Sequence, residues 1–597
     1  MKKLYQSKLL LVLLAAFMIL VTACNNEEGS TSEKEGKKDD LLSIDDFASA
    51  KKADGEIIDG GSLTYGLVSD TPFEGTLNFN FYQGTYDDEV ISWFDESILD
   101  TDENYMYTQD GAATFEVSED KKTFTFTIRD NVNWHDGKPV TAEDWAFAFE
   151  VLGDPDYPGT RFAEASNVQG FEDYRSGKAD SISGLKIIDD KTLQITFVEA
   201  NPSLLASGIW THPMPKHIFG DMKVADMESS PEIREHPIGF GPFKVDSIVP
   251  GESVVYKKNE DYWRGEPKLD EVVLKVVNPS VVTKSLQDGD VDIAVYPTDQ
   301  YKDNVKALSN VDFLGKIDLA YTYIGFKLGK WQDNKNVMDP NMKMSDVNLR
   351  KAMAHAVNNQ DVGEQFYDGL RWAGTTVIPP SHPAFHDDSN PGLEYDPEQS
   401  KKILDENGYK DTNGDGLRED KNGNELVINF ASMSGGDIAE PLANYYIQKW
   451  KEVGLNVKLV DGRLLEFNSF YDRLEADDKA IDIFQGAWGV GSDVDPTGLW
   501  GSAAAFNYTR WTNEESDQLL AEGISEKAFD EQYRSEVYDK WQKLMTEEIP
   551  AFPTLYRSEL TAVNKRVANW DVKPGTKLFN DRSQLGVTAE KPEVAGQ

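Results

Sequence analysis

The chain has 597 residues, a formal net charge of −44 and a hydrophobic content of 39%. This length is several times that of a usual domain, so it predicts two or three domains with sizeable cores. The charge excludes nucleic acid as a partner, because its phosphates would be repelled. The single cysteine excludes an intrachain disulfide and any metal site built from clustered cysteines.

The first 23 residues have the pattern of a secretory signal peptide. Three lysines within the first eight residues precede an apolar run over residues 9–21, which is too short to span a membrane and suits the hydrophobic region of a signal. Residues 20–24 read LVTAC, which is similar to a lipobox. We therefore expect a signal peptide over residues 1–23 and lipidation of Cys24, whose acyl chains would hold the protein to a membrane. The alternative is a signal peptide that only happens to carry a cysteine near its cleavage site.

Residues 24–58 are polar and charged, with few large apolar residues. Such a segment cannot bury enough surface to offset the entropy of ordering it, so we predict a lipidated tether here. The first strand is expected just beyond, where Leu63, Tyr65 and Leu67 alternate with other residues.

Residues 123–152 predict a strand, a turn and a helix in succession. Residues 123–128 alternate threonine with phenylalanine or isoleucine, which is typical of a half-buried strand. Thr141 and Asp144 form a capping-box pattern that starts a helix. The apolar stripe of that helix, at spacings i, i+3, i+4 and i+7, consists of Trp145, Ala148, Phe149 and Leu152.

The order of residues in this segment resembles the signature of the extracellular solute-binding proteins of peptide-type ABC transporters, family 5. The matching positions are Arg129 after the strand, the turn Trp134-His135-Asp136-Gly137, and the helix start at residues 141–144. An ordinary strand–turn–helix would explain the periodicity but not these identities. We expect His135 to hydrogen-bond backbone in the turn and to have no catalytic role. Residues 237–244, 259–263 and 286–294 also look like landmarks of the family.

The resemblance implies an α/β class with two lobes, the type II periplasmic-binding-protein-like fold, and an additional domain. The extra domain would span residues 80–180, and lobe II would span residues 320–554. Lobe I would be discontinuous and would combine residues 59–79, 181–319 and 555–585.

Several local patterns agree with a mixed α/β fold. Residues 185–197 alternate on both sides of an Asp-Asp turn and predict a hairpin. Ser345 is a candidate cap for a helix, and Asp396-Pro397 is typical of an N-cap followed by proline in the first helical position. Residues 426–459 read as strand, helix and strand, which predicts a βαβ unit with parallel strands.

Asp411, Asn413 and Asp415 have the spacing of oxygen ligands at the start of a calcium loop, with glycine in the sixth place. The twelfth position holds an asparagine, which cannot give a bidentate carboxylate, although a nearby acidic residue could replace it. The alternative is a solvated turn after a helix. A bound calcium would be structural, and we expect no other cofactor.

Residues 482–496 are the best candidate for a ligand site. Trp488 offers a flat apolar wall, and the glycines let a ligand backbone approach closely. The resemblance implies that an aspartate after the tryptophan pairs with the α-ammonium of a bound peptide, although the spacing here is longer than the common one. We prefer Asp493 over Asp495, whose place before a proline indicates a turn. The alternative is an acidic, glycine-rich surface loop. The candidate ligand-binding residues are Trp488, Gly489, Gly491, Ser492, Asp493 and Asp495.

Signatures of an enzyme are missing from the sequence. It has no nucleophile elbow, no Walker loop and no HExxH motif, and the prolines around His382 and His386 indicate loop residues rather than metal ligands. We therefore expect a protein that is not an enzyme.

The function that the resemblance implies is to bind extracellular oligopeptides between two lobes and to deliver them to the permease subunits of an ABC transporter. The protein would be a monomer held by its lipid anchor at the extracellular face of the bacterial cell membrane. Two alternatives remain: a different solute, such as a nickel chelate, a sugar or a heme-like ligand, or a peptide-sensing receptor without a transport role.

Overall fold

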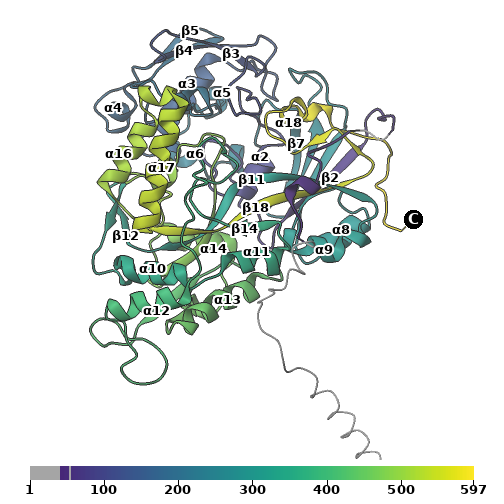
Figure 1. Cartoon of the computed structure of the whole chain (residues 1–597). Helices are drawn as coiled ribbons and strands as arrows, with labels where there is room; N and C mark the ends of the chain where they lie inside the picture. The colour runs from purple at the N-terminus through teal and green to yellow at the C-terminus, as the bar shows by residue number, and fades with distance from the viewer. Residues whose placement is uncertain (1–40, 53–54, 597) are drawn as a thin grey trace, which may run out of the picture. The chain divides into compact units, whose positions relative to one another are not determined.

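The computed structural model describes residues 41–52 and 55–596, and Leu42–Gln597 forms one compact unit (Figure 1). The predicted signal peptide, Cys24 and the predicted tether up to residue 40 lie outside the described residues. The prediction of a tether as far as residue 58 is wrong at its carboxyl end. There, β1 (Ala50–Lys51) pairs with β20 (Trp570–Asp571), and η2 (Ile44–Asp46) precedes it. A pairing partner so distant in sequence cannot be read from composition.

A large mixed sheet runs through the unit, with two long antiparallel strands at its centre. These are β11 (Val311–Phe326) and β18 (Ala551–Asn564). The order β10-β2-β9-β8-β7 continues beyond β18, and the order β17-β15-β16 continues beyond β11. The predicted first strand is confirmed as β2. The bounds are β2 (Ser62–Val68), β7 (Phe243–Val249), β8 (Ser253–Lys258), β9 (Glu271–Val277), β10 (Ile293–Tyr296), β14 (Arg371–Ala373), β15 (Val427–Ala431), β16 (Asn456–Leu459) and β17 (Ile483–Gly489).

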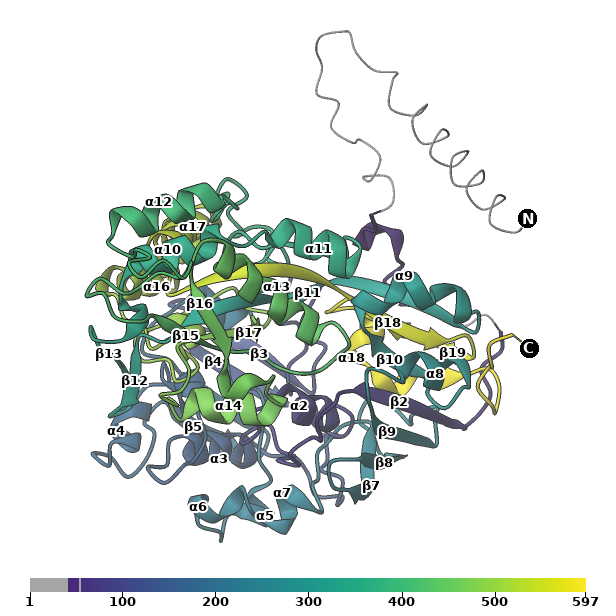
Figure 2. The same cartoon turned by 90° about the horizontal axis from the view of Figure 1, so that it is seen from below.

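Each end of this sheet has its own hydrophobic core. One large core draws on residues 63–293, with Leu314 from β11 and a few from residues 563–587, and the second draws on residues 321–556. We call these two parts lobe I and lobe II. In Figures 1 and 2 the strands β11 and β18 run from one to the other. The helices of lobe II are α10 (Val347–His355), α11 (Asn359–Tyr367), α12 (Pro397–Glu406), α13 (Ala439–Glu452), α14 (Phe467–Glu475), α15 (Thr497–Trp500), α16 (Glu514–Gly523) and α17 (Glu531–Glu548).

Several short helices, one small hairpin and one short antiparallel strand pair complete the fold. The helices outside lobe II include α2 (Thr85–Ile91), α4 (Phe171–Arg175), α5 (Lys216–Phe219), α6 (Val224–Met227), α7 (Pro231–Arg234), α8 (Val282–Gln287), α9 (Tyr301–Asn304) and α18 (Lys577–Asn580). The hairpin pairs β12 (Gly329–Gln332) with β13 (Lys335–Met338). The antiparallel pair joins β19 (Val567–Ala568) to β21 (Gly586–Val587), with β20 and α18 between them in the chain.

A second, four-stranded sheet forms the extra domain, at the top of Figure 1. Its order is β3 (Ala113–Val117), β4 (Thr123–Ile128), β6 (Thr192–Thr196) and β5 (Leu185–Asp189), all antiparallel. The predicted hairpin of residues 185–197 is confirmed. Because β6 pairs with β4, this sheet extends past residue 180. The predicted domain limit at that residue is therefore wrong, since it would divide one sheet between two domains. The other domain limits stay predictions.

The signature segment folds as its pattern predicts. Strand β4 buries the apolar residues at 124, 126 and 128, and α3 (Ala142–Leu152) follows. Both hydrogen bonds of the capping box between Thr141 and Asp144 form. The Asp144 carboxylate also accepts from Nε1 of Trp134 at 3.1 Å, which joins the turn to the start of the helix.

His135 connects this turn to a second family landmark. Its Nδ1 accepts from the Gly239 amide at 3.2 Å, so its Nε2 carries the proton and donates to the Gly241 carbonyl at 3.1 Å. Burial lowers the pKa of His135 to about 3, so the ring is neutral at physiological pH. The predicted backbone role of His135 is confirmed.

The patterns that predicted helices and strands in the second half of the chain are confirmed with one exception. β15 and β16 are parallel with α13 between them, and Asp396 caps α12 with Pro397 in the first position. The prediction of Ser345 as a cap is wrong by one residue. Asp346 caps α10 by accepting from the amide of Asn348, and Ser345 ends the short 3-10 turn before it.

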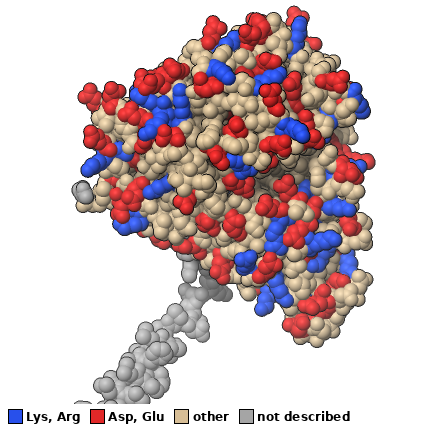
Figure 3. Space-filling view, turned by 180° about the vertical axis from the view of Figure 1, so that it is seen from behind, with Lys and Arg blue, Asp and Glu red and all other residues tan. Residues whose placement is uncertain are grey.

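Two properties of the chain, the hydropathy of its helices and the charge of its surface, limit what the protein can contact. Within the described ranges, no helix is long and apolar enough to cross a membrane. Figure 3 shows acidic side chains spread over one face of the molecule with basic ones between them. Negative charge distributed in this way repels a polyanion.

Candidate functional site at the lobe junction

The strands β11 and β18 change register where they pass from lobe I to lobe II. Residues 311–317 pair regularly with 558–564, and pairing resumes with Tyr321 opposite Tyr556. Irregular pairing lets a strand pair bend locally. β17 pairs with β11 only from Ala320 onwards, so the irregularity lies at the edge of lobe II. We call residues 317–321 with 556–558 the hinge.

Four charged side chains lie in the hinge or next to it on one face of the sheet. Lys316 Nζ lies 3.0 Å from Glu559 Oε1, and Arg557 Nε lies 2.5 Å from Asp318 Oδ2. Burial raises the pKa of Glu559. Burial acts to lower the pKa of Lys316, but the neighbouring carboxylates outweigh it and raise that pKa. The four side chains still keep 15–27% of their surface exposed. Charges of both signs are therefore partly accessible at this point of the sheet.

The predicted ligand stretch begins in the last residues of β17, beside the hinge. The half-buried ring of Trp488 stacks on Tyr508 and Tyr323, with ring centroids 5.4 and 6.2 Å apart. Gly489 is exposed, and Gly491 is exposed with φ +67° and open space where a Cβ would lie. These two glycines leave room for a ligand main chain to approach.

Asp493 and Asp495 follow in the same loop, with Ser492 half-buried before them. Asp493 Oδ1 accepts from Arg534 Nη2 at 3.2 Å. Asp495 Oδ1 accepts from both the amide and the hydroxyl of Thr497, at 3.0 and 2.6 Å, in a turn. Burial, together with the charge of Asp493, raises the pKa of Asp495 to about 6. The assignment of Asp493 as an amine anchor stays a prediction.

Lobe II and the extra domain meet around these carboxylates. His382 is 7% exposed, and its ring centroid lies 6.2 Å from that of Tyr105, in the extra domain. Burial lowers the pKa of His382 to about 4, against the charge of Asp493, so the ring is neutral. Burial raises the pKa of Tyr107, and Asp493 adds to that rise. We call the surfaces that meet here the lobe junction.

Arg534 is a residue of the candidate site that sequence reasoning missed. It lies on α17 in line with Tyr538, Trp541 and Met545, at i, i+4, i+7 and i+11, and all four are buried. A charged residue in an otherwise apolar helical stripe is the signal that could have identified it. The charged residues at the hinge could have been noticed in the same way. In each of the strands β11 and β18, two charged residues are two positions apart and so lie on the same face.

The predicted calcium loop folds as a series of tight turns. Asp411 accepts from the amides of Gly414 and Gly416 at 2.6 and 2.9 Å, and the Asn413 and Asp415 side chains each accept from an amide two residues on. In the part of the chain that the structure describes, no group of three or more His, Cys, Asp or Glu side chains is placed to hold a metal ion. Calcium binding by Asp411, Asn413 and Asp415 stays a prediction. A chelator should lower the melting temperature if the loop is occupied.

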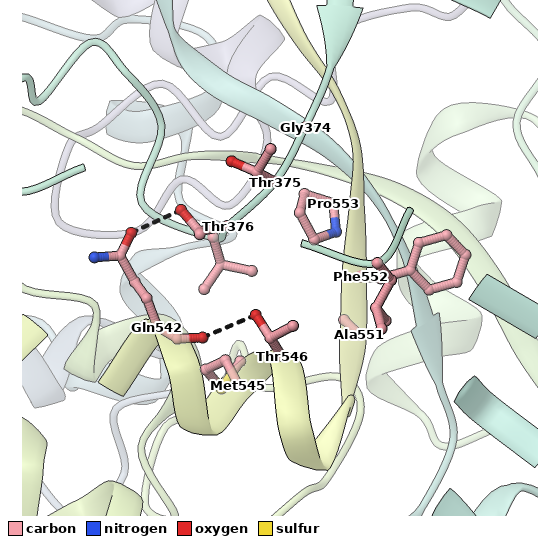
Figure 4. Close-up of a pocket in the computed structure, with 11 residues that line it drawn as sticks. Gly374, Thr375, Thr376, Gln542, Met545, Thr546, Ala551, Phe552 and Pro553 are labelled. Atoms are coloured by element: carbon pink, nitrogen blue, oxygen red, sulfur yellow. Dashed lines mark hydrogen bonds between the residues drawn. The ribbon is translucent and has the colours of Figure 1, made fainter. Parts of the chain in front are cut away.

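Two cavities lie away from the lobe junction. One of about 20 Å³ lies between β18, α17 and residues 374–377, where the Thr376 hydroxyl donates to Gln542 Oε1 at 2.7 Å (Figure 4). It has room for one water molecule and none for a peptide. The other is an open hollow of about 640 Å³ at the carboxyl ends of β2 and β9, with Asp70 in its lining. Asp70 accepts from Ser434 of lobe II at 2.9 Å, so the lobes also meet there.

Comparison with known proteins defines the class. Residues 107–510 match the bacterial extracellular solute-binding proteins, family 5. The oligopeptide-binding protein OppA of Lactococcus lactis subsp. lactis is 32% identical over 509 residues, which cover 83% of this chain and 84% of that protein. The structure of lactococcal OppA complexed with an endogenous peptide in the closed conformation is 30% identical, with a TM-score of 0.85 over 88% of this chain and all of that one. The oligopeptide-binding protein AppA of Bacillus subtilis is 27% identical over 544 residues, 89% of this chain and 93% of that protein.

The chain belongs to the bacterial extracellular solute-binding proteins of family 5. It has the type II fold of that family, with two lobes and an extra domain. The family consists of solute-binding proteins that work outside the cell.

Proposed function

We propose that this protein binds extracellular oligopeptides between its two lobes and delivers them to the permease of an ABC transporter. The observation that carries the proposal is the charge of the site at the lobe junction. Asp493 and Asp495 face one guanidinium, that of Arg534, and the buried His382 beside them is neutral. The site therefore retains one net negative charge.

A single positive charge on the ligand would complete this site. Burying a charged group costs several kcal/mol unless an opposite charge meets it. The α-ammonium of a peptide is such a group, and every unmodified peptide carries one. Arg534 uses Asp493 Oδ1, which leaves the second oxygen of that carboxylate for a ligand.

The surroundings suit an extended peptide of varied sequence. The exposed Gly489 and Gly491 allow a peptide main chain to lie close to the end of β17, as an added strand would. The paired charges at the hinge are of both signs and partly exposed, so they can meet ligand side chains of either charge. Relatives named for oligopeptide binding, and the peptide held by lactococcal OppA, support the same choice of ligand.

Identification of the native ligand tests this proposal. The protein would be purified from its own cells without refolding, denatured, and its released ligands analysed by mass spectrometry. A mixture of short peptides with free amino termini is expected. A nickel chelate, a sugar or a heme released in stoichiometric amount would contradict it. Loss of peptide uptake when the gene is deleted would separate transport from sensing.

We also propose that Cys24 is lipidated and anchors the protein, as a monomer, at the extracellular face of the membrane. The lipobox-like LVTAC at residues 20–24 supports this. Cells that express the protein should incorporate labelled fatty acid into it, and Cys24→Ala should abolish the label. Equal labelling of the variant would contradict the anchor.

A further inference from the structure

Arg534 belongs to lobe II but contacts both sides of the lobe junction. Its Nε donates to the Gly523 carbonyl at 3.0 Å, which fixes the guanidinium against the end of α16. Its Nη2 donates to Asp493 Oδ1 at 3.2 Å and to the hydroxyl of Ser203 at 2.9 Å. One nitrogen thus joins the candidate ligand carboxylate to a residue on the opposite side.

Ser203 lies on the other side of the junction from Arg534. It belongs to η4 (Pro202–Leu205), whose Leu205 carbonyl accepts from the amide of Tyr107 in the extra domain. Arg534 and Ser203 are only 5% and 6% exposed. Lobe opening would separate the two side chains, and the Nη2 group would then donate its hydrogen bond to water. Their burial is therefore a property of the closed arrangement.

A second contact occurs between the same parts of the molecule. Lys121, in the turn between β3 and β4, places its Nζ 3.6 Å from the ring centroid of Phe529. Phe529 ends η9 (Glu526–Phe529), directly before α17. The extra domain and the adjacent η4 therefore contact α17 and the segment just before it at two places, Ser203 and Lys121.

We propose that Arg534 is a positioning residue that couples lobe closure to the orientation of the Asp493 carboxylate. In the closed arrangement Ser203 and Gly523 hold the guanidinium on two sides, and the guanidinium holds Asp493 with one oxygen free. Opening removes Ser203, so the carboxylate loses its fixed orientation and the ligand amine loses its best partner. This inference rests on the proposed function, because it assigns a regulation to the same site.

The proposal predicts a selective effect on dissociation. A hydrogen bond from a charged donor contributes about ten- to a hundredfold to an equilibrium constant. Ser203→Ala should therefore raise the dissociation rate of a peptide with a free amino terminus by about that factor. The same peptide with an acetylated amino terminus has no ammonium to lose and should respond less, since only the contribution of the Arg534–Ser203 bond to lobe closure is lost.

Ser434→Ala is the matched control, because it removes another hydrogen bond between the lobes at Asp70, away from Asp493. It should speed dissociation of both peptides equally. In the Asp493→Asn background, Ser203→Ala should add little. Equal acceleration of both peptides by Ser203→Ala, or no acceleration, would overturn the coupling.

A measurement without peptide separates this inference from the proposed function. Small-angle scattering of the peptide-free Ser203→Ala protein should shift toward a larger radius of gyration than that of the wild type. An unchanged radius would show that the Arg534–Ser203 bond does not hold the lobes. Failure of wild-type protein to bind any peptide would instead refute the proposed function.

Discussion

At the scale of single residues, replacing Asp493 tests most directly how the ligand is recognised. Replacement by asparagine keeps a hydrogen-bond acceptor for Arg534 but removes the charge that would meet the α-ammonium. Truncating one partner of a buried charge pair costs about 2–5 kcal/mol, or roughly thirty- to several-thousandfold in affinity. Calorimetric titration of Asp493→Asn should show a loss of this size.

Acetylation of the peptide provides the control for that experiment. It should weaken binding to the wild type by a similar factor and matter little to Asp493→Asn, because each change removes the same interaction. If acetylated and free peptides bind the wild type equally well, Asp493 is not an amine anchor.

Asp495 predicts how affinity depends on pH. Its pKa is raised to about 6 by burial and by Asp493, so below pH 6 it is protonated in the empty site. A bound ammonium favours the carboxylate form, so binding must release that proton and affinity falls by up to about tenfold per pH unit below 6. Titrations at pH 7 and pH 5 should show this fall for the free peptide. An equally steep fall for the acetylated peptide would point to another group.

At the scale of elements, the sequence identified those whose partners are close along the chain. The alternation of β4, the capping box of α3, the proline start of α12 and the βαβ unit follow from local spacing, and the structure has them. The pairing of β6 with β4 and of β1 with β20 depends on contacts that spacing cannot show.

The candidate site was predictable only in part for the same reason. Trp488 and the glycines near it lie in one stretch, but Arg534 is 41 residues from Asp493 and 331 from Ser203. The hinge arises from a register change between two strands that are far apart in sequence. The paired residues Thr322 and Leu555, for example, are 233 residues apart. No pattern within either strand specifies that pairing.

The His135 turn gives a prediction about stability. His135→Gln removes a neutral, buried ring that bonds Gly239 and Gly241, and it should lower the free energy of unfolding at pH 7.5 by about 2–3 kcal/mol. Urea unfolding followed by fluorescence measures this change. Peptide affinity should stay unchanged, since the turn contributes no residue to the candidate ligand site.

The same substitution should matter less at pH 5. The folded protein keeps His135 neutral, with a pKa of about 3, whereas a histidine in the unfolded chain titrates near 6.5. Below pH 6.5 the unfolded state binds the extra proton, so this histidine's contribution to stability is present above that pH and is lost as pH falls toward 3. A wild-type advantage that is equal at pH 7.5 and pH 5 would show that the ring is not held neutral.

At the scale of the whole molecule, the two lobes have separate cores and share two long strands. Contacts between the lobes at Arg534–Ser203 and Asp70–Ser434 depend on closure, while the hinge strands remain paired on either side of the register change. A ligand between the lobes would stabilise the closed arrangement by binding it better than the open one. This links the charge of the lobe junction to a change in shape.

Small-angle scattering of the mature protein, with and without a saturating free peptide, tests this account most directly. The radius of gyration should decrease on binding, and the acetylated peptide should need a higher concentration to produce the same decrease. A radius that stays constant while calorimetry shows the peptide bound would contradict enclosure between the lobes.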